Sequence, residues 1–329
     1  MINTGELSST MPLIDMPLEK LYHYEGRNPR PTDFDDYWNQ GLAELDTLDP
    51  QVELEPYPLK SHFAECFHLW FTGVGGARIH AKYVRPKKVD TPHPAIVEFH
   101  GYSGHSGDWH GKLAWASQGF SIASLDCRGQ GGLSEDVGGV KGNTLRGHII
   151  RGLIDGPDKL YYRSVFLDTA LMTRIVMSFD EVDATRVGAM GGSQGGGLTL
   201  ACAALEPRIK KAAPTFPFLC DYKRVWEMDL AKGAYEEIGQ FFRHFDPLHK
   251  NEDLWWERLG YIDNQHLAPR IQAEVLMPIG LMDTICPPST QMAAFNRIPG
   301  QKDLLIYPDF GHEGLPGAND TVFDFMSNL

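Results

Sequence analysis

Hydrophobic positions alternate along the chain between short apolar runs and longer stretches in which apolar residues return every three or four positions. The runs have the length of strands and end in turns: Ala95–His100, Phe120–Asp126, Val187–Met190, Ile209–Ala213, Glu274–Gly280 and Asp303–Tyr307. Helical spacing covers Trp109–Ser117, Lys159–Phe179 and Gly196–Leu205, and helix-like segments follow the last two runs. Buried parallel strands are apolar throughout and are joined by helices. The pattern therefore predicts an α/β fold with a mostly parallel central sheet and helices on both faces.

Two parts of the chain depart from this rhythm. Residues 1–60 are polar and rich in proline, with one helical stretch at Phe34–Leu48 and Asp33 as the expected N-cap. We interpret them as an N-terminal arm that wraps the rest. Residues 217–269 are rich in aromatic and charged side chains and predict a helical insertion over the edge of the sheet. Because neither part forms a domain by this reading, we expect residues 1–329 to be a single domain.

A hairpin is predicted between the arm and the first apolar run. Glu65–Phe71 and Arg78–Val84 alternate apolar and polar residues, and the glycine-rich segment 73–76 separates them. Two alternating runs around a short turn of this kind are typical of paired antiparallel strands.

Composition and charge exclude several classes of protein. Of the 329 residues, 42% are hydrophobic and 22% are charged, which allows a large core and excludes a disordered chain. The net charge of −13 argues against a nucleic-acid partner, which would favour a basic surface. No run of 18 apolar residues occurs, so we expect no membrane partner.

The five cysteines are scattered along the chain and none forms a CxxC pair. This spacing is typical of reduced thiols rather than of a disulfide framework or a thiolate zinc site. The segment Met1–Leu21 lacks a basic stretch followed by an apolar one, so we see no secretory signal. A soluble, cytoplasmic protein is the resulting prediction.

The clearest chemical signal is the sequence Gly191-x-Ser193-x-Gly195, which stands between a predicted strand and a predicted helix. A serine on a sharp strand-to-helix turn needs neighbours without Cβ atoms, because the backbone folds tightly around it. The turn exposes the serine hydroxyl, and the amide at the start of the helix faces a developing oxyanion. Ser193 is therefore the candidate nucleophile.

Residues that would serve Ser193 as base and acid follow it in the chain. His312 lies in a loop after the strand candidate Asp303–Tyr307, at the sheet edge where catalytic side chains gather. Asp283 ends another strand-like run, whereas its rival Asp309 is only three residues from His312 and poorly placed to orient that ring. We favour Asp283 as the acid.

These roles define a mechanism. His312 takes the proton of Ser193 as general base and later protonates the leaving alcohol, while Asp283 holds the imidazole tautomer. The backbone amides of Gln194 and Tyr102 are the expected oxyanion hole.

Two weaker patterns are discounted. His100, His105 and His110 recur at intervals of five, which matches no compact zinc pattern, so we assign no metal. The segment 129–131 resembles the start of a dinucleotide fingerprint, but Ser134 replaces the third glycine, so no cofactor is expected.

Several motifs together resemble the acetyl xylan esterase and cephalosporin C deacetylase family, carbohydrate esterase family seven. They are Arg128-Gly129-Gln130, Gly191-Gly192-Ser193-Gln194-Gly195, His312-Glu313, Gly280-Leu281-Met282-Asp283 before Pro287-Pro288-Ser289, and Pro217-Phe218-Leu219. Their order is kept over roughly residues 10–325, and the combination is much more specific than a single GxSxG.

The resemblance implies an α/β-hydrolase fold, the triad Ser193, Asp283 and His312, and an oxyanion hole from Tyr102 and Gln194. It also implies removal of acetyl groups from acetylated xylo-oligosaccharides and from cephalosporin C, in a homohexamer with inward-facing active sites. Arg128, Gly129 and Gln130 are implied as structural support, and we expect Arg128 to bond loop carbonyls through its five donors.

Two alternative functions stay open at this stage. One is a peptidase or lactone hydrolase on the same fold, and the other is a non-catalytic binding protein. The complete set of Ser193, Asp283 and His312 argues against the second.

Overall fold

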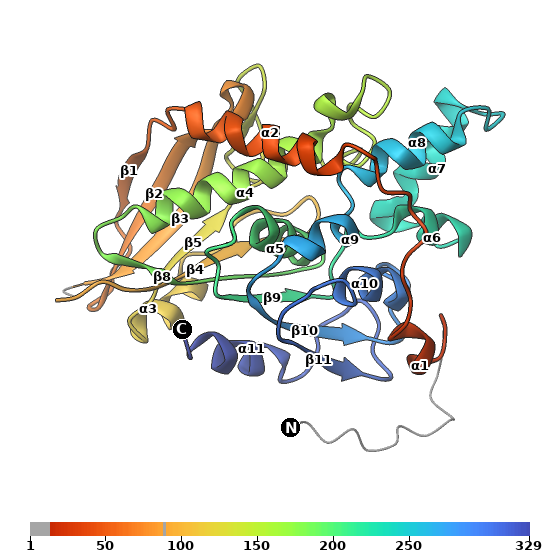
Figure 1. Cartoon of the computed structure of the whole chain (residues 1–329). Helices are drawn as coiled ribbons and strands as arrows, with labels where there is room; N and C mark the ends of the chain where they lie inside the picture. The colour runs from red at the N-terminus through yellow and green to blue at the C-terminus, as the bar shows by residue number, and fades with distance from the viewer. Residues whose placement is uncertain (1–13, 88–89) are drawn as a thin grey trace.

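The computed structural model describes residues 14–87 and 90–329 (Figure 1). Its centre is a nine-stranded sheet in the order β1-β2-β3-β5-β4-β8-β9-β10-β11. The strands are β1 (Glu53–Tyr57), β2 (Ala64–Thr72), β3 (Arg78–Pro86), β4 (His93–Phe99), β5 (Ser121–Leu125), β8 (Val182–Gly192), β9 (Lys211–Thr215), β10 (Glu274–Gly280) and β11 (Lys302–Tyr307). From β5 to β11 neighbouring strands pair in parallel, whereas the pairs β1–β2, β2–β3 and β3–β5 are antiparallel. A separate two-stranded ribbon joins β6 (Glu135–Asp136) and β7 (Val140–Lys141).

Helices cover both faces of the sheet (Figure 1). One face carries α2 (Phe34–Thr47), α4 (Tyr161–Met177) and α5 (Gln194–Leu205), and the other carries α3 (Leu113–Ser117) and α11 (Ala318–Met326). Two separate buried clusters match these faces: Phe166 and Leu200 belong to the larger, and Trp115 and Met326 to the smaller. The central strands are mostly apolar because both of their faces are buried.

The helices between β9 and β10 gather beyond the carboxyl ends of the parallel strands (Figure 1). They are α6 (Tyr222–Glu227), α7 (Glu236–Phe245), α8 (Glu252–Gly260) and α9 (Asn264–Leu267). They pack their own aromatic core, in which Phe241 and Trp255 meet edge to face at 5.1 Å between ring centroids. This segment therefore covers the edge of the sheet at which we expected the candidate catalytic residues.

The N-terminal arm binds to these helices rather than to the sheet alone. Asp221 accepts hydrogen bonds from the Tyr24 hydroxyl at 2.7 Å and from the backbone amide of Asn28 at 2.8 Å. The indole of Trp38, which is fully buried, donates to the carbonyl of Tyr261 at 2.9 Å. The short helix α1 (Leu18–Leu21) packs near α10 (Pro288–Phe295). Residues 1–13 of the predicted arm lie outside the described residues.

The structure agrees with the predicted fold class, which is confirmed. Each predicted strand is present with its ends shifted by at most two residues, except that the predicted Val187–Met190 lies near the end of the much longer β8. The edge strand β1 of the arm was not predicted, because its exposed residues and Pro56 hid its pairing with β2. Asp33 is the N-cap residue of α2, as predicted, but its side chain makes no capping bond, and its carboxylate accepts from the Tyr261 hydroxyl.

In residues 14–87 and 90–329, every helix is too short or too polar to cross a lipid bilayer.

Candidate active site

Ser193 sits on the sharp turn between β8 and α5. Its φ of 58° lies in the left-handed region, which a residue with a side chain rarely adopts. The two flanking glycines make this turn possible. A Cβ at Gly191 would lie 2.5 Å from the carbonyl oxygen of Phe99, and one at Gly195 would lie 2.0 Å from the same atom. The spacing of the motif thus reflects the close approach of α5 to the end of β4.

His312 and Asp283 meet Ser193 at the carboxyl edge of the sheet. The Nε2 atom of His312 lies 2.9 Å from Ser193 Oγ, and its Nδ1 lies 2.7 Å from Asp283 Oδ2. Because a carboxylate only accepts, Nδ1 carries the proton and Nε2 is left to accept from the serine hydroxyl. The His312 side chain is 19% exposed, so a substrate can reach it, whereas Asp283 is fully buried.

Asp283 is fixed by its own loop. Its Oδ1 accepts from the backbone amides of Ile285 and Cys286, both at 2.8 Å, so the carboxylate can turn little. Asp309, the rival acid, is exposed, and the nitrogen that it would orient is bound to Asp283. The structure thus places the favoured acid against the imidazole.

Two backbone amides flank the serine. The amide of Gln194 opens helix α5, and the amide of Tyr102 belongs to the loop after β4. Neither donates a hydrogen bond to another group in residues 14–87 and 90–329. Free donors at a helix N-terminus and in the adjacent loop are what an oxyanion requires.

Arg128 and Gln130 support the region around the candidate oxyanion hole through buried hydrogen bonds. The guanidinium of Arg128 makes two bonds of 2.7 Å to Asp168, a residue of α4, and a third of 3.1 Å to the carbonyl of Val74. Gln130 donates to Gln194 Oε1 at 2.8 Å and accepts from the Ser103 amide at 3.0 Å. The expectation that Arg128 bonds loop carbonyls was therefore only partly right, since a buried carboxylate is its main partner.

Gly129, the middle residue of this motif, has a φ of 67°, and a Cβ there would lie 3.2 Å from Asp136. Glycine is therefore the residue that fits both the backbone conformation and the space at this position.

The sequence analysis missed two acids that support the site. Asp168 is the one acidic residue in the helical run of 161–177, and an acid directly after the apolar stretch 165–167 was the signal that pointed to a buried partner. Glu237 is buried in the insertion, and its carboxylate accepts from the Tyr102 hydroxyl. No pattern in the sequence distinguishes it from its exposed neighbour Glu236.

The three discounted histidines do not come together. His100 is half-buried and accepts a bond of 3.0 Å from the amide of Cys127, while His105 and His110 are exposed. In the described residues, Asp283, Cys286 and His312 have ligand-type atoms within 4.8 Å of one another. Two of them are already engaged with each other, and burial raises the pKa of the Cys286 thiol, which favours its neutral form.

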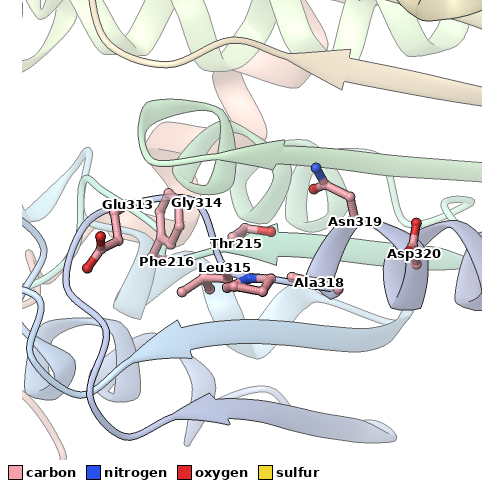
Figure 2. A pocket seen from close by; sticks show the side chains of 10 residues that line it. Thr215, Phe216, Glu313, Gly314, Leu315, Ala318, Asn319 and Asp320 are labelled. Carbon is pink, nitrogen blue, oxygen red and sulfur yellow. The ribbon is translucent and has the colours of Figure 1, made fainter.

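A hollow of about 450 Å³ lies between the end of β9 and the start of α11 (Figure 2). Its walls are Thr215 and Phe216 at the end of β9 and residues 313–320 at the start of α11. None of the three triad residues lines it, but the ring of Phe216 lies 4.6 Å from that of His312. The hollow therefore borders the imidazole on the side of α11.

Comparisons with known proteins agree with this geometry. A family profile described as acetyl xylan esterase matches residues 11–329. The acetyl xylan esterase 1 of Thermoanaerobacterium sp. is 56% identical, with a TM-score of 0.92 over 95% of this chain and 99% of that one. The acetyl xylan esterase of Paenibacillus sp. R4 is 40% identical, with a TM-score of 0.88 and the same coverage of both chains.

A curated relative, an acetyl esterase of Xylanibacter ruminicola, is 30% identical over 162 residues, which are 49% of this chain. The matched part is 35% of that protein, so this chain corresponds to about a third of the relative's length.

The family resemblance seen in the sequence is confirmed, and with it, at the level of the family, the predicted class of enzyme, a carboxylic ester hydrolase. This chain belongs to the acetyl xylan esterase family.

Proposed function

We propose that the protein is a serine esterase that removes acetyl groups from sugars through an acyl-enzyme. The proposal rests on one observation: His312 is hydrogen-bonded to both Ser193 and Asp283, and two backbone amides nearby have no other partner in residues 14–87 and 90–329. In this proposal Ser193, Asp283 and His312 are catalytic, Tyr102 and Gln194 form the oxyanion hole, and Arg128, Gly129 and Gln130 support them.

The first half of the reaction forms the acyl-enzyme. Ser193 Oγ attacks the acetyl carbonyl while its proton passes to His312 Nε2, and the negative charge on the carbonyl oxygen is held by the amides of Gln194 and Tyr102. The tetrahedral intermediate then breaks the bond to the alcohol, which takes the proton from His312. Asp283 stays ionised and stabilises the imidazolium while it exists.

The second half releases acetate. A water molecule gives a proton to His312 and attacks the acetyl carbon, and the same two amides hold the second oxyanion. When this intermediate collapses, Ser193 Oγ leaves with the proton from His312, and the free enzyme is restored.

We assign acetylated xylo-oligosaccharides and cephalosporin C as substrates. The names of the two solved acetyl xylan esterases described above support the first, and the family resemblance supports both. The hollow beside His312 also supports a sugar, because the leaving alcohol must lie near the residue that protonates it. Its volume of about 450 Å³ falls in the usual range of ligand sites, and Phe216 offers an aromatic wall.

Location, assembly and domain organisation complete the proposal. A cytoplasmic location is supported by five cysteines that are all free and buried. A homohexamer rests on the family resemblance, and light scattering would test it by giving six times the chain mass of 36.8 kDa. We regard residues 1–329 as one domain because the triad draws on three separate parts of the chain.

Replacing Ser193 by alanine tests the function. We expect the release of acetate from 4-nitrophenyl acetate and from acetylated xylo-oligosaccharides to fall by about 10⁴-fold or more. Peptide anilides and lactones serve as competing substrates with the unaltered enzyme. An unchanged rate in the Ser193→Ala variant would contradict the mechanism, and faster cleavage of the anilides would favour a peptidase.

A further inference from the structure

A buried acid of the insertion lies beside the loop that carries Tyr102. Glu237, in the first turn of α7, is 5% exposed. Its hydrogen-bond donors include the Tyr102 hydroxyl and the backbone amides of Ile149 and Ile150, none of which is charged. A carboxyl group buried among uncharged donors costs free energy, and here burial raises its pKa to about 7. A buried polar group that costs free energy calls for an explanation, and the parts of the chain that its hydrogen bonds hold in place provide one.

The two carboxylate oxygens bind different parts of the chain. Oε1 accepts from the hydroxyl of Tyr102, and Oε2 accepts from the amides of Ile149 and Ile150 at 2.8 and 3.2 Å. Glu237 thereby connects the insertion helix, the segment before α4 and the loop after β4. These three parts are far apart in sequence and meet at this one side chain.

Aromatic neighbours restrict the ring of Tyr102 but do not fix its hydroxyl. Phe218 and His148 meet this ring edge to face, at 5.6 and 5.0 Å between centroids. Burial lowers the pKa of His148 to about 4, so it supplies no charge to Glu237 at neutral pH. The hydroxyl also accepts a long bond of 3.4 Å from the His148 amide, so the bond to Glu237 is the stronger of the two contacts that set the direction of the Tyr102 side chain.

The backbone that follows Tyr102 is in an unfavourable conformation. Ser103 has a φ of 62°, in the left-handed region, and a turn closes where the Gly104 amide donates to the Gly101 carbonyl at 3.0 Å. On one side of Tyr102, the Ser103 amide is bound to Gln130 at 3.0 Å. The loop is also held by bonds from the Ser103 hydroxyl to the Leu145 carbonyl and from the Gly131 amide to the Gly104 carbonyl. The contact that holds the side chain of Tyr102 itself is its bond to Glu237.

We propose that Glu237 is a positioning residue, which holds the Tyr102 side chain so that the amide of the same residue points at the oxyanion. This inference rests on the proposed function, because it takes that amide as a donor to the acyl intermediate. Glu237 itself touches no reacting atom. The helical insertion thereby helps to shape the catalytic centre through a single carboxyl group.

The proposal predicts a particular kinetic signature. Donors of an oxyanion hole act on charge that develops in the transition state, so misplacing one lowers kcat more than it raises KM. A small displacement of a catalytic group already costs a large factor in rate. A substitution that only loosened the fold would instead lower the amount of active enzyme and leave the kcat of each intact site unchanged.

Three variants test the proposal: Glu237→Gln, Tyr102→Phe and the double variant. Glutamine keeps the size of the side chain but replaces one accepting oxygen by a donating NH₂, and phenylalanine removes the hydroxyl while the backbone amide remains. We expect each single variant to lower kcat for 4-nitrophenyl acetate about tenfold or more, with KM within about twofold. Because both alter the one contact between Tyr102 and Glu237, the double variant is expected to lose no more than the larger single loss. Counting active sites with a serine-directed organophosphate corrects each kcat for unfolded protein.

The matched control is Glu236→Gln, which makes the same change on the same helix at a side chain that is 53% exposed. It should keep the unaltered kcat. A boronic acid that forms a tetrahedral adduct provides a second measurement, since its inhibition constant should rise in parallel with the loss of kcat in Glu237→Gln.

Three results would overturn the positioning role: a normal kcat per active site in Glu237→Gln, a change confined to KM, or losses that multiply in the double variant. Failure of the proposed function is distinguished by the Ser193→Ala variant in the same assay. If that variant stays active, the mechanism itself is wrong. If it is inactive while Glu237→Gln is normal, only the role of Glu237 is wrong.

Discussion

Replacing Asp168 by asparagine would remove the charge that neutralises Arg128 in the interior. Both side chains are 1% exposed, and two bonds of 2.7 Å join them. Asparagine keeps the shape, but it offers one accepting oxygen and turns an NH₂ group toward the guanidinium. The positive charge of Arg128 then remains buried without its paired carboxylate, and the Val74 carbonyl at 3.1 Å and the Asp136 carboxylate at 4.0 Å are its other partners.

The magnitude follows from the burial of the pair. Breaking a buried ion pair by removing one partner costs about 3–5 kcal/mol of unfolding free energy. For a chain of this size, each kcal/mol lowers the melting temperature by about 2 °C, so we expect a decrease of about 6–10 °C. Scanning calorimetry of the unaltered protein and of Asp168→Asn at one scan rate measures this difference.

Two further variants make the reasoning refutable. Glu44→Gln removes the partner of Arg163 from a pair whose side chains are 13% and 44% exposed, and it should cost less than about 1 kcal/mol. The apolar pair Arg128→Met with Asp168→Leu should recover most of the lost stability, because no charge then remains buried. If Asp168→Asn were no more harmful than Glu44→Gln, or if the double change simply added two losses, burial of the charge would not be the cause.

Three more outcomes are expected. Asp283→Asn should lower kcat by about 10⁴-fold while Asp309→Asn stays within about twofold, and equal losses in an esterase assay would contradict the assignment of the acid. Between pH 4.5 and 7 the Glu237 carboxyl is protonated in the folded chain, where its pKa is about 7, but ionised in the unfolded chain, where the ordinary value is 4.5. Stability should therefore fall by about 3 kcal/mol as the pH rises through this window, and urea titrations should show the fall reduced in Glu237→Gln. Changing Asn319 and Asp320 to alanine should raise KM for acetylated xylo-oligosaccharides about threefold or more and leave KM for 4-nitrophenyl acetate unchanged. Equal shifts in the two KM values would contradict binding of the sugar in the hollow.

The sequence allowed the fold class to be predicted because the signals for it are local. Apolar runs of strand length and helical spacing depend on neighbouring residues, and the sheet from β4 to β11 follows them closely. Ser193 could be singled out because the glycines at 191 and 195 already indicate a tight turn in the sequence. Asp283 and His312 were found by their places after strands, which a parallel sheet brings to one edge.

The remaining features depend on contacts between distant residues. The strand β1 is exposed and contains a proline, so only its pairing with β2 defines it. Asp33 stands where a cap is expected, yet it is drawn to Tyr261, which is 228 positions away. Glu237 and Glu236 are adjacent and identical in type, and tertiary packing alone decides which of them is buried.

The attachment of the N-terminal arm has a consequence for synthesis of the chain. The partners of the arm are made late: Leu21 and Tyr24 offer their carbonyls to the side chain of Asn296 at 2.8 and 2.9 Å. At ribosomal rates of about 5–20 residues per second, the arm waits on the order of tens of seconds for these partners. During that time Leu21, which is buried in the finished fold, lacks these partners, whereas Trp38 waits only for Phe166 and Tyr261. The nascent chain is therefore vulnerable to aggregation through the arm, and docking of the arm near Asn296 should be among the last steps of folding.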